Sequence, residues 1–119
     1  MNNIDENFKF EANRSNLKIV TKAHVQKINF EGKKATGVSY YQKEKVVTVK
    51  ASREVILSAG SIGSPHILQV SGVGDSEKLK KHGIKTIHEL KGVGKNLQDH
   101  LMFRPVYKVK NLKSLNLSL

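Results

Sequence analysis

The sequence of 119 residues contains no cysteine, which excludes a disulfide framework, a thiolate zinc site and a cysteine nucleophile. It has no apolar run long enough to cross a lipid bilayer, so we expect no membrane span. Residues 1–11 carry three acidic side chains and no apolar stretch, so we expect no signal peptide there. None of these absences fixes the cellular compartment of the protein.

Acidic side chains are scarce relative to basic ones. Lys and Arg number 21 against 10 Asp plus Glu, a net charge of +11, which favours nucleic acid, an anionic membrane surface or a phosphate ligand. The lysines occur singly or in pairs, and the only adjacent aromatic residues are Tyr40 and Tyr41, so no base-stacking platform accompanies the charge. We therefore predict a dispersed, solvated basic surface and no nucleic-acid partner. The alternative is a small basic β-rich binding module for nucleic acid or acidic surfaces.

The first half of the chain has the short, β-branched and alternating segments that are typical of strands. Polar turns separate them, and Gly32 can adopt the positive φ that a tight hairpin turn requires. The pattern predicts an antiparallel meander with strands at residues 17–20, 23–30, 35–42 and 46–50.

Residues 54–58 differ, because three apolar residues follow one another there. Strands that are covered on both faces, as in parallel sheets, have such continuous runs. Small residues follow, and then Ser64 and Pro65 offer an N-cap and a first helical position. The pattern predicts a buried parallel strand, a turn of small residues and a helix that ends near Val70.

A second helix is predicted immediately afterwards. Asp75 is its expected N-cap, Gly83 offers a left-handed stop, and Leu79 and Ile84 occupy the paired apolar positions of a Schellman ending. The remaining chain is predicted to contain an extended segment, a polar loop that opens with glycine, and an edge strand or the approach to another region, at residues 85–90, 92–100 and 103–109.

Residues 60–74 look like the second signature of the glucose–methanol–choline (GMC) oxidoreductases, a family of FAD-dependent enzymes, and they meet every constrained position of that pattern. Residues 53–60 resemble the strand that leads into it. Residues 90–100 resemble the family's Gly-Val-Gly-x-Asn-Leu-Gln-Asp-His segment, except that Lys91 stands where proline is usual. The resemblance covers about residues 16–109.

The resemblance implies an α/β fold (α+β as a fragment). The chain would be part of an FAD-binding Rossmann-like domain with an antiparallel β-meander and an incomplete sheet. It further implies a partial FAD-binding domain at 17–100 and the start of the substrate-binding region at 101–119. Residues 1–16 are polar, rich in asparagine and without period, so we expect an irregular N-terminal segment there.

The same resemblance points to a set of cofactor-binding residues. A dinucleotide diphosphate needs backbone amides at close range, which Ala59, Gly60 and Ser61 could supply at a helix N-terminus. The resemblance also places the main chain of Val25 against the adenine end of FAD, and it includes Asn96 among the cofactor contacts. Without the resemblance, a turn of small residues is a common connection and Val25 is an ordinary core valine.

Two parts of such an enzyme have no counterpart in the sequence. The family's catalytic histidine lies in a C-terminal segment that is not present, and both Gly-Val-Gly runs, at 72–74 and 92–94, lack the third glycine of a Gly-x-Gly-x-x-Gly fingerprint. We therefore expect no catalytic residue, and an inactive fragment that does not retain FAD on its own. Its parent would oxidise the CH–OH group of an alcohol or sugar, as a dehydrogenase or oxidase similar to glucose dehydrogenase.

The acid and base of the polar loop are a further catalytic candidate. Asp99 and His100 are adjacent, and such a pair more often forms a local hydrogen bond that stabilises its loop. The other four histidines have no spacing typical of metal ligands, so no metal site is predicted.

Overall fold

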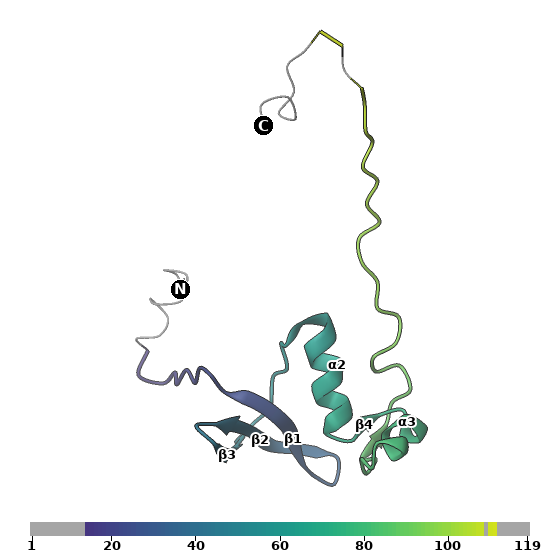
Figure 1. Cartoon of the computed structure of the whole chain (residues 1–119). Helices are drawn as coiled ribbons and strands as arrows, with labels where there is room; N and C mark the ends of the chain where they lie inside the picture. Colours follow the sequence, from purple (N-terminus) through teal and green to yellow (C-terminus); the bar gives the residue numbers. More distant parts are fainter. Residues whose placement is uncertain (1–13, 109, 112–119) are drawn as a thin grey trace.

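The computed structural model describes residues 14–108 and 110–111. In chain order its elements are β1 (His24–Glu31), β2 (Lys34–Gln42), β3 (Lys45–Lys50), α2 (Gly60–Val70), β4 (Val73–Gly74), α3 (Ser76–Lys81) and β5 (His88–Glu89) (Figure 1). Neither helix has the length and apolar character needed to cross a bilayer, as far as the described residues go.

Strands β1, β2 and β3 form an antiparallel sheet in that order, which confirms the predicted meander. Gly32 has φ +58° in the first turn, as expected, and Lys43 and Glu44 both have positive φ in the second. Such a pair of residues matches the right-handed twist of the flanking strands. The sheet stays open at its β3 edge, because no further strand of the described chain pairs there.

Helix α2 lies against the sheet, and its C-terminal end is tied to β1 by one side chain (Figure 1). The Oγ atom of Ser71, a residue that is only 5% exposed, accepts a hydrogen bond from the Ile28 backbone N–H at 2.8 Å. The same hydroxyl donates to the carbonyl of Ile67 in α2. Ser71 thus joins the last turn of the helix to the sheet.

A second, smaller unit follows α2. Strands β4 and β5 pair in parallel, and Gly72 accepts hydrogen bonds from the backbone N–H groups of Ile87 and His88. The extended segment predicted for residues 85–90 therefore exists, although only His88 and Glu89 of it pair with β4. Leu79 of α3 is 3% exposed, and among the described residues the buried apolar side chains are Leu79, Ile28 and Val73.

Both predicted ends of helix α3 are confirmed. The Asp75 side chain accepts from the N–H groups of Glu77 and Lys78, as an N-cap should. At the other end Gly83 has φ +69°, and the N–H of Ile84 donates to the Leu79 carbonyl at 2.9 Å. This bond is the 6→1 hydrogen bond that defines a Schellman motif.

The predicted start of helix α2 is wrong. The helix begins at Gly60, and Pro65 lies inside it. Ser64 does not cap the helix; its hydroxyl accepts a hydrogen bond from the backbone N–H of Ala59 at 2.9 Å. The helix therefore starts before Ser64, whose hydroxyl reaches back across the first turn to residue 59.

Two predicted strands are also wrong. Residues 17–20 and 54–58 are irregular and largely exposed, with Ile56 78% exposed. Residues 103–108 form no strand, so the edge-strand alternative for that segment is wrong and the approach to another region stays a prediction. Residue 109, the last of that prediction, lies outside the described residues, as does most of the segment 1–16. A strand needs a neighbour for its backbone groups, and the described chain offers none to these segments.

The Asp75 cap makes part of the stability dependent on pH. The Lys78 N–H, above all, lowers the pKa of Asp75, with smaller contributions from the Glu77 N–H and the Lys95 charge, while burial opposes them. A carboxylate with a lowered pKa stabilises the fold above its unfolded pKa of about 4, and this contribution is lost as the pH falls through the folded value. Asp75→Asn keeps an acceptor without titrating.

We therefore expect the helicity of the wild-type chain to fall more steeply than that of Asp75→Asn as the pH drops below about 5 and through the lowered pKa of Asp75, because only the wild-type chain has a titrating group at position 75. Asp75→Ala should have lower helicity throughout. Circular dichroism across this pH range measures the difference in helicity. If helicity depended on pH in the same way in the wild-type chain and in Asp75→Asn, the proposed role of the cap would be wrong.

Candidate cofactor site

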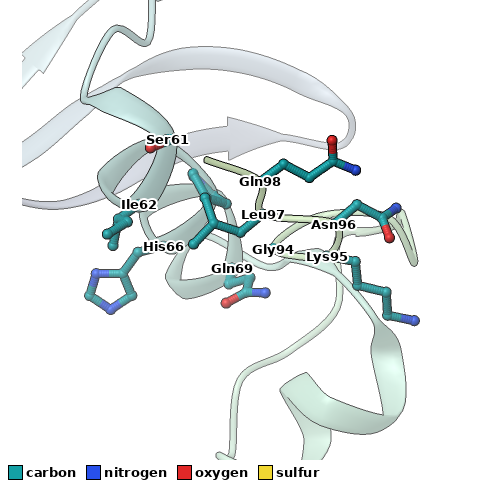
Figure 2. A pocket seen from close by; sticks show the side chains of 10 residues that line it. Ser61, Ile62, His66, Gln69, Gly94, Lys95, Asn96, Leu97 and Gln98 are labelled. Carbon is teal, nitrogen blue, oxygen red and sulfur yellow. The ribbon is translucent and has the colours of Figure 1, made fainter. Parts of the chain in front are cut away.

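An open groove of about 870 Å³ lies between helix α2 and the loop at residues 92–98. Figure 2 shows Leu97 on the side of the loop that faces the helix, whereas Lys95, Asn96 and Gln98 extend away from it. The helix contributes Ser61, Ile62, Pro65, His66 and Gln69, and the loop contributes Gly94, Lys95, Asn96, Leu97 and Gln98.

Two of the residues predicted from the sequence meet at this groove. Ser61 lies in the first turn of α2, and Asn96 lies in the loop, 35 positions later in the sequence. Asn96 is exposed and has φ +57°, a conformation that asparagine tolerates better than most residues. The chain thus brings a helix start and an amide side chain to one surface.

The backbone at the start of α2 is bare. Gly60 has φ +78°, and a Cβ atom built there would meet no heavy atom within 4 Å. Ala59, Gly60 and Ser61 are all exposed, and no side chain of the described residues caps the first turn. The first N–H groups of a helix without a cap can bind an anion, so this end suits a phosphate group. Ala59 and Gly60 adjoin the groove but are not among the residues that line it.

Val25 lies apart from the groove. It lines a separate hollow of about 550 Å³ with Gly63 and Ile67 of α2, and its side chain is 37% exposed. His66 borders both the hollow and the groove. The structure therefore places Val25 beside α2 without bringing it together with Asn96.

Sequence reasoning missed Gln69. Its Nε2 atom donates to the Val93 carbonyl at 3.1 Å, which connects α2 to the loop that carries Asn96. A glutamine near the end of a helix has no pattern that indicates such a contact, because the partner is a backbone atom 24 residues away.

The Asp99 carboxylate accepts a hydrogen bond from the backbone N–H of His100 at 2.7 Å. This bond is local, as predicted. Within the described residues, no three acidic or histidine side chains lie close enough to hold a metal ion.

A bare, uncapped helix start beside a groove, in a mixed α/β chain with an open antiparallel sheet, is the arrangement expected for part of a dinucleotide-binding flavoprotein. Residues 4–102 match the family model described as GMC oxidoreductase. The chain belongs to the GMC oxidoreductases, whose cofactor is FAD.

Several relatives agree with this assignment. The chain is 54% identical over 102 residues to an oxygen-dependent choline dehydrogenase of Chromohalobacter salexigens, a match that covers 86% of this chain and 18% of the relative. It is 54% identical over 90 residues to an alcohol dehydrogenase [acceptor] of Pseudomonas putida, covering 74% and 16%. The chain thus spans less than a fifth of the length of these relatives.

Solved structures show the same fold. An FAD-dependent oxidoreductase from Chaetomium thermophilum is similar with a TM-score of 0.72 at 44% identity, covering 76% of this chain and 16% of that one. A formate oxidase from Aspergillus oryzae gives a TM-score of 0.74 at 35% identity, covering 78% and 17%. The mixed α/β fold with an incomplete sheet is therefore confirmed.

Proposed function

We propose that this chain forms one wall of the FAD site of an oxidoreductase that acts on CH–OH donors, and that alone it is inactive. The observation that carries the proposal is the bare backbone of Gly60 at the uncapped start of α2, next to the groove. In this arrangement the backbone of residues 59–61 lies against the diphosphate. The Gly60 and Ser61 amides are available to it, since the Ala59 N–H already donates to Ser64. Asn96 contacts the cofactor from the loop, and the main chain of Val25 lies toward the adenine.

The proposal divides the chain as the resemblance does. Residues 17–100 belong to the FAD-binding domain and 101–119 begin the substrate-binding region, after the lead-in at 1–16. The apolar side chains of residues 101–107 support this division, because most of their surface stays exposed in the described chain. Phe103, for example, is 86% exposed.

The donor is proposed to be an alcohol. Two of the relatives above are named for choline and for alcohol, so they favour a simple alcohol as the donor over a sugar such as glucose. FAD supplies the acceptor for the hydride, and a base must take the hydroxyl proton. Asp99, the acid of the loop, binds a neighbouring backbone N–H, and we assign it no part in the reaction.

A titration of the ¹⁵N-labelled chain with FAD tests the site. We expect weak binding that shifts the amide signals of Gly60, Ser61 and Asn96, because one wall supplies only part of the contacts. After desalting, no flavin absorbance should remain, and no dye should be reduced with choline or simple alcohols. Reduction of the dye would contradict the proposed inactivity, and retention of stoichiometric flavin would contradict the proposal that the chain supplies only one wall of the site.

Gly60→Ala should abolish the shift at Ser61, since a Cβ would stand where the phosphate approaches. Gly83→Ala is the matched control, because Gly83 has a similar φ and equally open surroundings but lies at the far end of α3. The site would be refuted if the amide signals that FAD shifts belonged mainly to residues away from α2. It would also be refuted if the FAD-induced shift of the Ser61 signal persisted in Gly60→Ala.

The net charge of +11 favours the second candidate, a binding module for nucleic acid or acidic surfaces. We propose that it does not apply, because no stacking aromatics accompany the charge. A salt titration with generic duplex DNA separates the two: a steep, log-linear loss of affinity with several phosphate contacts would favour the binding module.

A further inference from the structure

The loop at residues 92–98 has little structure of its own. Two turn hydrogen bonds hold it: one inside the loop, from Lys95 N–H to the Gly92 carbonyl, and one from Val93 N–H to the carbonyl of Leu90, which precedes the loop. Beyond it the described chain has no helix or strand as far as residue 108. The place of Asn96 relative to helix α2 therefore depends on contacts that cross the groove.

Gln69 makes the clearest of these contacts. Its side-chain amide donates to the Val93 carbonyl at 3.1 Å, and this bond is partly buried. The ion pair of Lys95 with Asp75, at 3.7 Å, also reaches the loop, but the Lys95 side chain is 44% exposed. Exposed ion pairs fix a geometry only weakly, so the amide bond is the stronger constraint.

The residue after Val93 supports the same conclusion independently. Gly94 has φ +75°, and a Cβ atom on it would lie 2.7 Å from Nε2 of Gln69. The loop backbone thus passes so close to the glutamine amide that a side chain at position 94 would displace it. Gln69 touches two consecutive loop residues, one by a hydrogen bond and one by close packing.

We propose that Gln69 is a positioning residue, which fixes the loop against α2 and so holds Asn96 in place for the cofactor. This inference rests on the proposed function. The side chain acts through its N–H donor, because its partner is a carbonyl oxygen that can only accept. A side chain of similar length without a donor should leave the loop unanchored.

Gln69→Met removes the donor and keeps the length, and Gln69→Glu places an acceptor against the Val93 carbonyl. In both variants we expect the Lys95 amide to exchange about tenfold faster, as for the loss of one net hydrogen bond. The FAD-induced shift of Asn96 should disappear while that of Ser61 remains. Gln42→Met is the matched control, since the Gln42 amide also donates to a backbone carbonyl, that of Thr21 at 2.7 Å, but Gln42 does not line the groove.

A double-mutant cycle with position 94 gives a second test. Gly94→Ala should accelerate exchange of the Lys95 amide strongly in the wild-type chain, because the new Cβ displaces Gln69. In a Gln69→Ala background that clash is gone and only the cost of positive φ remains, so the effect should be several-fold smaller. Equal effects in the two backgrounds would refute the contact.

The outcomes separate the inference from the proposed function. If FAD shifts neither Ser61 nor Asn96 in the wild-type chain, the proposed function fails, and the inference fails with it. If both shifts occur and both persist unchanged in Gln69→Met, the inference alone is wrong. Loss of both shifts in Gln69→Met with unchanged exchange at Lys95 would also contradict a role in positioning.

Discussion

Gly72→Ala is expected to lower the free energy of unfolding by about 3 kcal/mol, the sum of positive-φ strain and overpacking. Gly72 has φ +90°, and a Cβ there would lie 2.6 Å from the Lys85 carbonyl oxygen and 3.0 Å from Ile87. Its own carbonyl accepts from the N–H groups of Ile87 and His88. The methyl group would therefore push β5 away from β4, and urea unfolding together with exchange of the Ile87 amide measures the loss.

Gly83→Ala separates strain from crowding. Gly83 has φ +69°, but a Cβ there would meet nothing within 4 Å, so only the conformational cost of about 1 kcal/mol applies. A similar loss for both variants would show that the backbone near Lys85 adjusts freely, contrary to the close packing described above.

Ser71→Ala should cost about 2 kcal/mol, because it leaves a buried N–H group without a partner. The hydroxyl of Ser71 is the acceptor for the Ile28 N–H, and Ile28 is itself only 6% exposed. We expect the Ile28 amide to lose protection against exchange first, since the contact between α2 and β1 would open there. Urea unfolding measures the overall change.

Ser76→Ala is the matched control for this substitution. Its hydroxyl also makes one hydrogen bond, to the Glu89 carboxylate at 2.7 Å, but on the exposed surface. Water can replace that bond, so its loss should change stability by less than about 0.5 kcal/mol. Equal costs for the two serines would mean that Ser71 does not join helix and sheet in solution.

The elements that could be predicted from the sequence are those with local causes. The meander follows from alternation and turn residues, and helix α3 follows from Asp75, Gly83 and the Leu79–Ile84 pair, all within one short segment. Each of these signals acts between residues fewer than ten positions apart.

The errors arise where structure depends on distant partners. Residues 54–58 have the composition of a buried strand, yet Ile56 is exposed because no described strand lies beside it. At the site, the small residues at 59–61 and Asn96 could be proposed from sequence, and the structure brings Ser61 and Asn96 to one groove. The contact made by Gln69 could not be predicted, since a glutamine amide bonds to any carbonyl in reach.

The unpaired segment at 54–58 also governs how copies of the chain behave toward one another. Its free backbone groups and apolar side chains can pair with any strand that approaches, including the same segment of a second molecule. The net charge of +11 opposes that approach by mutual repulsion, which dissolved salt weakens over a Debye length of about 10 Å at 0.1 M. We therefore expect copies of the isolated chain to associate more readily as the salt concentration rises.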